Sequence, residues 1–332
     1  MTRSSDLATL VRISRLYYDL GETQESIGRI IGVPRPQVSK LLKRARAEGV
    51  VEIRIIDRTE APSTLADDLR GRLGLDKVYL TPAFGGSEEL TRRRVGRLAA
   101  GVLSAAVRDG MTVGVGDGSA ISALADGLEE APSPVAATIV PLCGGFWKAT
   151  SGHEPFRRIA EAFGATAHGM LAPGLLDDEA TRDALRAHAG IRAVTDLWSR
   201  LDVAVFGIGG PTWSESGVGA DALRELDEAG AVVEVLIAPF TRGGTFVGES
   251  LRRRTIAFDA RDLHLLPTTI AVASGAAKVI PILGAARSGV IGTLVTDADT
   301  ATAILQAAVE PGREVGRSSP PRGSPGSART NP

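Results

Sequence analysis

The sequence has almost no cysteine, since Cys143 is the only one among 332 residues. A single thiol excludes a disulfide framework and a thiolate zinc cluster within one chain. The four histidines, His153, His168, His188 and His264, are far apart in the sequence. They form no local metal-binding motif, so we expect neither a bound metal nor another cofactor.

Long hydrophobic runs are also missing. No apolar stretch approaches the roughly 18–20 residues that cross a bilayer, and the N-terminus lacks the apolar core and cleavage site of a signal peptide. We therefore expect a cytoplasmic protein with no membrane partner. Apolar residues make up 43% of the chain and charged residues 23%, a balance that excludes wholesale disorder. At roughly 100–200 residues per domain, the length suggests two domains or one large domain with an appendage.

The net charge is only −1, but basic residues are concentrated at the two ends of the chain. Residues 1–58 contain 11 Lys and Arg against 7 Asp and Glu, and residues 311–332 contain 4 against 1. The residues between contain 23 basic and 31 acidic side chains. This asymmetry suggests that the N-terminal part meets a polyanion while the body has another task.

Residues 1–56 are predicted to form a helix-turn-helix DNA-binding domain. An amphipathic stripe predicts a first helix that ends near Gly21, with apolar or half-buried positions at Leu7, Leu10, Val11, Ser14, Tyr17 and Tyr18. Thr23 is placed to cap a short second helix, and Gly32 supplies a left-handed turn at its end. The apolar positions of this second helix are Ile27, Ile30 and Ile31. Two short helices joined by a tight glycine turn are typical of this motif.

The third helix begins at Arg35 and ends at Gly49. Beyond it the apolar pattern changes to period two at Val51, Ile53 and Ile55, which predicts a short strand of the kind that forms a wing. Residues 57–62 are predicted to be a polar hinge. Residues 311–332, rich in Gly, Pro, Ser and Arg, are predicted to be a disordered tail.

Residues 63–310 are predicted to form an α/β domain, because short apolar runs alternate with amphipathic segments. The predicted strands are 111–115, 138–142, 167–171, 203–208, 232–237, 270–273 and 293–296. The predicted helices are 65–73, 88–107, 120–128, 155–163, 179–188, 219–229, 276–284 and 298–308. Strands and helices that alternate in this way form a parallel sheet covered on both faces.

The third N-terminal helix carries the residues of a DNA contact surface. A helix in the major groove needs long hydrogen-bond donors near its N-terminus for base edges and cations further along for phosphates. Arg35 and Gln37 are placed to contact bases, and Ser39, Lys40, Lys43 and Arg44 to contact phosphates. The alternative is a solvated basic face on a structural helix. The agreement of turn, cap and following strand favours DNA.

Several predicted strands of the body end in glycine-rich turns. In an open parallel sheet, ligands bind beyond the carboxyl ends of the strands, where helix N-termini expose amides. The turns are Gly114-Val-Gly-Asp-Gly-Ser119, Cys143-Gly-Gly145, Gly207-Ile-Gly-Gly-Pro-Thr212 and Ser274-Gly-Ala-Ala-Lys278. Each glycine alone is as well explained by a tight turn, but four such turns and a lysine favour a small-molecule crevice.

Other side chains leave the chemistry of this crevice open. Asp117 would repel a phosphate but accept hydrogen bonds from sugar hydroxyls. Trp147 and Trp213 could stack on a sugar, and Lys148 could form an imine with an aldehyde, although packing and surface roles are the simpler explanations. Asp117, Glu234 and Asp297 are candidate bases for a sugar isomerase, yet no tight motif joins them.

Together these segments resemble the SorC/DeoR-type sugar-responsive transcriptional regulators of bacteria. Their helix-turn-helix is similar to the stretch TQESIGRIIGVPRPQVSKLLKRARAEGVVEIRI, and their effector domain to GMTVGVGDGSAISALADGL, IVPLCGGF, DVAVFGIGGP and VASGAAKVIPILGAARSGVIGTLVTDADTA. The resemblance spans about residues 7–305. It implies a Rossmann-like, sugar-phosphate isomerase-type domain without catalytic activity, which assembles into homodimers or homotetramers. It also implies a sugar-type effector that alters the affinity for double-stranded operator DNA.

Carried over by position, the resemblance places several residues in the effector site. They are Gly116, Asp117, Gly118, Ser119, Gly144, Gly145, Gly209 and Lys278. The chain departs from the family pattern at Asp117, where an aromatic residue is common, and at Ser119, where threonine is. It also has Val233-Glu234 in place of Gly-Asp and Pro239-Phe240-Thr241 in place of a phenylalanine-aspartate element, so the resemblance does not decide whether the effector carries a phosphate.

The sequence therefore predicts a regulator of carbohydrate metabolism that is not an enzyme. One alternative is a sugar or sugar-phosphate isomerase-like enzyme with an accessory helix-turn-helix. Another is a DNA-binding assembly protein without an effector, which thermal stabilisation by a ligand would exclude.

Overall fold

The computed structural model describes residues 3–51, 63–83, 86–128, 134–145, 155–210 and 218–309. The chain divides into two compact units, Met1–Arg58 and Thr59–Pro332. The predicted wing beyond Val51, the hinge at 57–62 and the tail at 311–332 lie outside the described residues. Across the described ranges, no helix combines the length and the apolar character needed to cross a membrane.

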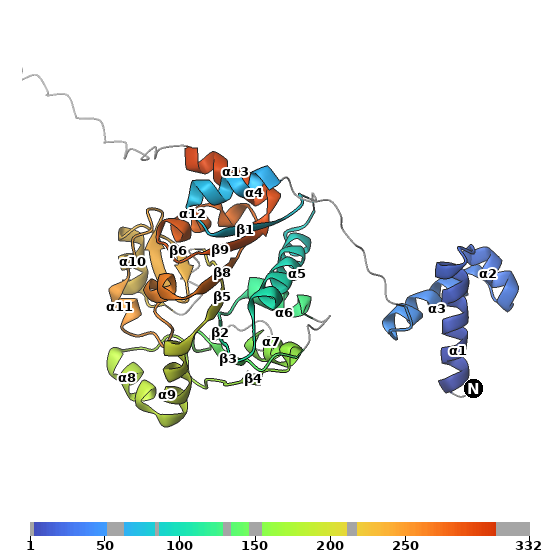
Figure 1. Ribbon diagram of the computed structural model, residues 1–332, viewed down its shortest axis with the longest axis horizontal. Coiled ribbons are helices and arrows are strands. Elements are labelled where there is room, and N and C mark those ends of the chain that lie inside the picture. Colours follow the sequence, from blue (N-terminus) through green and yellow to red (C-terminus); the bar gives the residue numbers. More distant parts are fainter. Residues whose placement is uncertain are drawn as a thin grey trace, which may run out of the picture. The chain divides into compact units, whose positions relative to one another are not determined.

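In residues 3–51, the described part of the first unit, three helices (Figure 1) surround a small apolar core. They are α1 (Arg3–Ser14), continued by the π-helical turn η1 (Arg15–Asp19), α2 (Gln24–Ile31) and α3 (Arg35–Ala47). The predicted cap of α2 is confirmed, because the Thr23 hydroxyl accepts a hydrogen bond from the Ser26 amide at 3.1 Å. The predicted left-handed turn is confirmed as well, since Gly32 has a φ of 74°.

The turn between α2 and α3 depends on a close backbone approach at Gly28. A Cβ atom at this position would lie 2.6 Å from the Val33 carbonyl oxygen. The core itself differs from the predicted stripe in two places. Ile13 is fully buried although it was not among the predicted positions. Ile30 was among them, but its side chain is 46% exposed. In the eight-residue α2 the buried face is occupied by Ile27 and Gly28 instead.

Where the structure describes the second unit, it contains a sheet of seven parallel strands in the order β1-β9-β8-β5-β2-β3-β4. The strands are β1 (Lys77–Thr81), β2 (Thr112–Val115), β3 (Thr138–Pro141), β4 (Thr166–Ala167), β5 (Val203–Gly207), β8 (Thr268–Val272) and β9 (Thr293–Asp297). A separate antiparallel hairpin is formed by β6 (Ala231–Val235) and β7 (Ala238–Thr241). The α/β class predicted from the sequence is confirmed.

The direction of winding reverses at the centre of this sheet. From β2 the chain adds β3 and then β4 on one side, whereas β5 pairs with the opposite edge of β2 and is followed outward by β8 and β9. Such a switch point leaves a crevice beyond the carboxyl ends of the two central strands, because their connections leave in opposite directions. The crevice of this fold is therefore expected beyond Val115 and Gly207.

Helices cover both faces of the sheet. Helices α5, α6 and α7 lie along one face (Figure 1), where their apolar residues pack against Val203 and Val205 of β5. Ala204 and Phe206 point to the other face, which is covered by the remaining elements, among them α4, α9, α12 and α13. The helices are α4 (Ser63–Leu73), α5 (Glu88–Ala106), α6 (Ser119–Gly127), α7 (Pro155–Phe163), α8 (Glu179–Ala187), α9 (Ala189–Thr195), α10 (Ala220–Glu228), α11 (Glu249–Arg252), α12 (Val279–Arg287) and α13 (Ala298–Val309). The 3₁₀ turns in the described part of this unit include η2 (Asp196–Arg200), η4 (Ala260–Leu265) and η5 (Ala276–Lys278).

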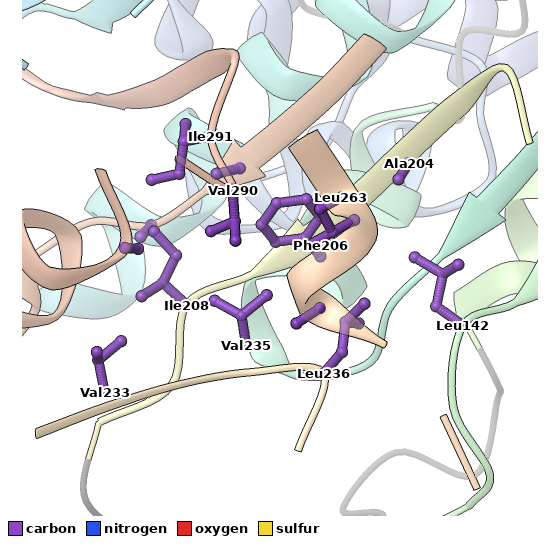
Figure 2. Packing of buried hydrophobic residues seen from close by; sticks show 14 of the residues in the cluster. Leu142, Ala204, Phe206, Ile208, Val233, Val235, Leu236, Leu263, Val290 and Ile291 are labelled. Atoms are coloured by element: carbon purple, nitrogen blue, oxygen red, sulfur yellow. The ribbon is translucent and has the colours of Figure 1, made fainter. Parts of the chain in front are cut away.

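Two predicted strands differ in the structure. The run 232–237 is not a strand of the parallel sheet, because it belongs to the β6–β7 hairpin, whose Val233, Val235 and Leu236 pack against the core (Figure 2). The run 167–171 contributes only the end of the two-residue β4. The edge strand β1 was not predicted, because its apolar run Val78-Tyr79-Leu80 is only three residues long.

Helix α5 offers a matched pair of substitutions that tests the packing of α5 against α6. A Cβ atom on Gly96 would lie 2.5 Å from the Ala123 backbone, whereas Gly101 on the same helix has nothing within 4 Å. Gly96→Ala should therefore lower the free energy of unfolding by about 1–3 kcal/mol. Gly101→Ala should raise it by up to about 1 kcal/mol, because alanine favours the helix. Urea denaturation of both variants measures this, and equal effects would contradict the close packing.

Candidate functional site

The exposed face of α3 carries the residues predicted to contact DNA. Val38, Leu42 and Ala45 are buried against the first unit's core. The opposite side carries Arg35, Gln37, Lys40, Lys43 and Arg44, all exposed, with Ser39 half-buried beside them. Pro34 precedes the helix and provides no side-chain cap. Arg35 therefore stands at an open helix N-terminus, where a base-contacting side chain is needed.

Two of the arginines on α3 already have partners. Arg44 forms an ion pair with Glu48, with Nε and Oε1 2.6 Å apart. Arg46 donates to the Tyr18 hydroxyl from Nε at 2.9 Å and from a terminal nitrogen at 2.7 Å, and it lies over the Tyr18 ring. Arg46 therefore fixes α3 against the first helix, which is a structural role.

The glycine-rich turns of the second unit meet at the switch point. Gly116, Asp117, Gly118 and Ser119 connect β2 to α6, and Gly209 follows the neighbouring β5. The Asp117 carbonyl approaches Gly207, 3.7 Å from where a Cβ atom on that glycine would be. The turns after β3 and β8, which flank these two strands, bring Gly144, Gly145 and Lys278 to the same edge. The predicted effector residues thus follow four adjacent strand ends.

Gly144 and Gly145 are explained by close backbone packing. A Cβ atom on Gly144 would lie 2.6 Å from backbone atoms of Ala172 and Pro173. The Gly145 amide donates to the Ala172 carbonyl at 2.9 Å, and the Gly174 amide donates back to the Gly145 carbonyl at 2.8 Å. These glycines hold the β3 turn against the segment that follows β4.

Asp117 turns its carboxylate onto its own loop. Oδ1 accepts the amide of Gly118 at 2.7 Å, while the residue remains exposed. The buried Cys143 lies near Asp117. Burial raises the pKa of the Cys143 thiol, and the carboxylates of Asp117 and Glu234 raise it further, against an amide hydrogen bond from Asp117. The thiol is therefore protonated and unsuited to nucleophilic chemistry.

Glu234 and Lys278 form a pair of opposite charges near the switch point. Burial raises the pKa of Glu234 to about 7, although the Ile237 backbone amide and the Lys278 ammonium favour its charged form. Burial likewise lowers the pKa of Lys278, and Glu234 opposes that shift. Glu234 is fixed by an antiparallel bridge to Gly209, whose amide donates to the Glu234 carbonyl at 2.8 Å. The segment that follows β5 is thereby joined to the hairpin.

The tip of this hairpin supplies two residues that the sequence analysis missed. Leu236 and Ile237 connect β6 to β7 with φ angles of 50° and 67°. A Cβ atom on Gly116 would lie 3.3 Å from Leu236 Cδ2, and one on Gly174 would lie 2.9 Å from Ile237 Cδ1. The hairpin tip therefore packs against the turns that follow β2 and β4. No sequence signal identifies it, because a turn with positive φ at both positions usually contains glycine or asparagine.

Asp297, one of the candidate bases, serves the loop that carries Lys278. The carboxylate of Asp297 is buried and accepts the Thr300 amide at 2.9 Å and the Thr300 hydroxyl at 2.5 Å. That hydroxyl in turn accepts the Gly275 amide at 2.8 Å. Asp297 is therefore a structural anchor and not a free base. Trp147, Lys148 and Trp213 lie outside the described residues.

The raised pKa of Glu234 predicts how stability depends on pH. The folded protein binds this proton more tightly than the unfolded chain, in which glutamate titrates near 4.5. The contribution of Glu234 is therefore most favourable below pH 4.5 and is lost as the pH rises to about 7. We expect a loss on the order of 2 kcal/mol between about pH 5 and 7.5, and Glu234→Gln should abolish this loss.

Urea denaturation at the two pH values measures this difference. The control is Glu228→Gln, which changes an exposed glutamate on α10 and should keep the wild-type pH dependence. An unchanged pH dependence in Glu234→Gln would show that the carboxylate titrates as in the unfolded chain.

Comparisons with known proteins agree with this architecture. Residues 57–306 match the family model described as "Putative sugar-binding domain". The sorbitol operon regulator of Klebsiella pneumoniae is 27% identical over 92% of this chain and 100% of its own length. The erythritol catabolism regulatory protein EryD of Brucella abortus is 27% identical over 91% of this chain and 97% of its own.

Solved structures show the same similarity. The crystal structure of the full-length sorbitol operon regulator SorC from Klebsiella pneumoniae superposes with a TM-score of 0.73 at 26% identity, covering 90% of this chain and 99% of that chain. A sugar-binding domain of a transcriptional repressor from Vibrio fischeri superposes with a TM-score of 0.69 at 26% identity, over 75% of this chain and 100% of that one. The chain belongs to the family of SorC/DeoR-type sugar-binding transcriptional regulators.

Proposed function

We propose that this protein regulates genes of carbohydrate metabolism by binding operator DNA through α3 and a small sugar-type effector through the crevice at the β2–β5 switch point. The observation that carries the proposal is their combination in one chain. A helix-turn-helix with an exposed basic helix precedes a sugar-binding family domain whose glycine turns gather at its switch point. The relatives named above for sorbitol and erythritol support a sugar or polyol as the effector.

The roles on α3 follow from position. Arg35 and Gln37 lie in the first turn, where side chains of a recognition helix contact base edges. Ser39, Lys40, Lys43 and Arg44 lie further along and would contact phosphates, which fix the register of the helix on the duplex. Two-fold related half-sites would match a homodimer or homotetramer.

In the crevice, the Gly116–Ser119 turn, Gly209 and Lys278 would face the effector, with Gly144 and Gly145 supporting the neighbouring turn. Binding would favour one of two states of the second unit and so change the operator affinity. We place the protein in the cytoplasm, where operator DNA is found.

Catalysis is the second candidate, and one observation favours it. Glu234 has a pKa of about 7 and lies near Lys278 in the crevice, an arrangement frequent in active sites. The relatives are transcriptional regulators, however, and Asp297 is committed to Thr300. We therefore propose that the crevice binds its ligand without turnover, which incubation of the full chain with sugars and sugar phosphates tests directly.

Fluorescence anisotropy on duplexes from upstream of the gene tests the whole proposal. At fixed salt, we expect saturable binding of a specific duplex that is shifted by one member of a panel of sugars, polyols and their phosphates. No preference over random duplex, with or without the panel, would contradict the proposal.

Two substitutions on α3 separate base contacts from phosphate contacts. Arg35→Ala should cost about 1–3 kcal/mol on the specific duplex and relax base preference, because it removes a base-contacting donor. Lys43→Ala should weaken specific and random duplexes alike and reduce the salt slope by about 1. Anisotropy titrations over a salt series measure both, with Lys77→Ala, an exposed lysine of β1, as the control. Identical effects of Arg35→Ala and Lys43→Ala on specific and random duplexes would contradict the assignment of Arg35 to bases and Lys43 to phosphates.

Lys278→Met tests the link between the crevice and DNA binding. This variant keeps the apolar stem but removes the ammonium that faces Glu234. Operator binding without effector should stay within about twofold of wild type, while the effector-induced shift should fall at least about tenfold, or ~1.4 kcal/mol. Anisotropy with and without the effector measures this, and Lys77→Met is the matched control. A full effector response in Lys278→Met would exclude this lysine from the site.

A further inference from the structure

The first unit exposes several large apolar side chains. Of the eight large hydrophobic side chains that are exposed in the described part of the chain, four belong to residues 3–51. They are Leu7, Val11, Leu20 and Ile30, with exposed fractions of 49%, 37%, 70% and 46%. Single exposed apolar residues need no explanation, but a contiguous group indicates an interaction surface. Three of these four residues lie on α1 and the turn that continues it.

These three residues line one groove along α1 and η1. The groove has a volume of about 570 Å³. Its lining includes Leu7, Val11, Arg12, Arg15, Leu16 and Leu20. They follow two rows with a spacing of four residues, so they form a continuous strip on one side of the helix. We call these six residues the α1 stripe.

The α1 stripe lies beside the core of the first unit and apart from its DNA face. Ile13, on the core side of α1, is fully buried in a cluster that contains Val38 and Leu42 of α3. No described residue of α2 or α3 lines the groove. A partner seated on the α1 stripe would therefore leave the exposed basic face of α3 free for DNA.

The charges beside the apolar residues favour a second copy of the chain as this partner. A two-fold axis presents the same stripe to itself, and the two helices then run in opposite directions. Asp19 continues the row of Val11 and Arg15 at the same spacing, and it is exposed. When Arg12 lies opposite Asp19 of the second copy, Val11 lies opposite Leu20. The symmetry repeats both contacts, so opposite charges meet and apolar side chains meet.

This register also accommodates the second arginine of the stripe. Arg15 lies opposite Leu16 near the two-fold axis. The aliphatic stem of an arginine can cover an apolar side chain while its guanidinium stays in water. Arg15 is exposed and Leu16 is half-buried, so the arrangement buries no charge. An acidic helix of another protein would also attract the two arginines, but it would meet Asp19 as a like charge.

From this complementarity we infer that the first units of two chains associate through their α1 stripes, in antiparallel orientation, with Arg12 paired to Asp19 of the second copy and Val11 packed on Leu20. The contact goes beyond the proposed function, because it requires neither effector nor DNA to form. It would hold two α3 helices as a symmetric pair, which is the arrangement that two-fold related half-sites need.

Cysteines introduced at Val11 and Leu20 test the contact in the full chain. In the paired stripes each thiol at one site faces a thiol at the other site of the second copy. Within one chain the two sites are nine residues apart on a continuous helix, roughly 13 Å, which is too far for a disulfide. Oxidation of dilute Val11→Cys/Leu20→Cys with copper phenanthroline should therefore convert most of the protein into a covalent dimer on a non-reducing gel.

Two controls should give no covalent dimer. One is the wild type, whose single cysteine, Cys143, is buried. The other is Val11→Cys/Ile30→Cys, because Ile30 is exposed on α2 outside the groove. The introduced sites are exposed, so folding should be unaffected, and thermal unfolding checks this.

Three results would overturn the inference. They are no dimer from Val11→Cys/Leu20→Cys, as much dimer from the Ile30 control, and a dimer from Val11→Cys alone. Specific operator binding by a protein that gives any of these results would leave the proposed function intact and contradict only the contact between the stripes.

A charge exchange tests the pairing of Arg12 with Asp19. In the cross-linking background, Arg12→Asp should slow dimer formation at least about fivefold, because like charges then face each other. Adding Asp19→Arg should return the rate to within about twofold of the starting value, because opposite charges face each other again. Adding Glu25→Arg instead restores the net charge at an exposed site outside the groove and should not help. Equal rescue by Asp19→Arg and Glu25→Arg would overturn the pairing.

Discussion

The pairing of β2 with β5 is the constraint on which the second unit depends. Val113, Gly114 and Val115 pair in parallel with Val203, Ala204 and Val205, although 90 residues separate the two segments. This pairing places β3 and β4 on one side and β8 and β9 on the other, so the connections that leave β2 and β5 diverge. A ligand crevice at this position is a consequence of the winding and does not require any particular side chain. The side chains decide only what the crevice accepts.

Burial of both faces of the sheet explains why the strand ends come so close together. Gly114 and Gly96 have no room for a Cβ atom, because Leu142 and the Ala123 backbone occupy the space. Helix α6 therefore packs tightly on α5, and its N-terminus is held at a fixed place beside β2. The same close packing engages the amides of Gly144, Gly145 and Gly209, which donate to neighbouring segments. These glycines therefore serve chain packing, and the charged side chains near the switch point are Asp117, Glu234 and Lys278.

The features that the sequence predicted well are those set by local chemistry. The Thr23 cap, the Gly32 turn and the alternation of strands with helices each depend on residues within a few positions of one another. The hairpin was beyond such reasoning, because the apolar run through Val233 and Val235 looks like a central strand until its partner is known. Glu234 was recognisable as a carboxylate, but its raised pKa comes from burial by segments distant in sequence. The hydrogen bonds of Gly144 and Gly275 are equally non-local, so sequence alone could not separate a ligand amide from a packing amide.

The strained tip of the hairpin shows how apolar packing determines the electrostatics of the crevice. Leu236 and Ile237 adopt positive φ angles at a cost of about 1–3 kcal/mol each, which is highest for a β-branched residue. Both side chains are buried, with Leu236 in the main core and Ile237 in a smaller cluster that contains Cys143 and Leu251. Burying a side chain of this size contributes about 1.5–3 kcal/mol, which offsets the strain. A glycine at Ile237 would relax the turn but leave the smaller cluster without its contact. The position of Glu234, three residues earlier and bridged to Gly209, is therefore fixed by hydrophobic contacts on both sides of the turn. Apolar packing of Leu236 and Ile237 therefore positions the Glu234 carboxylate that faces Lys278.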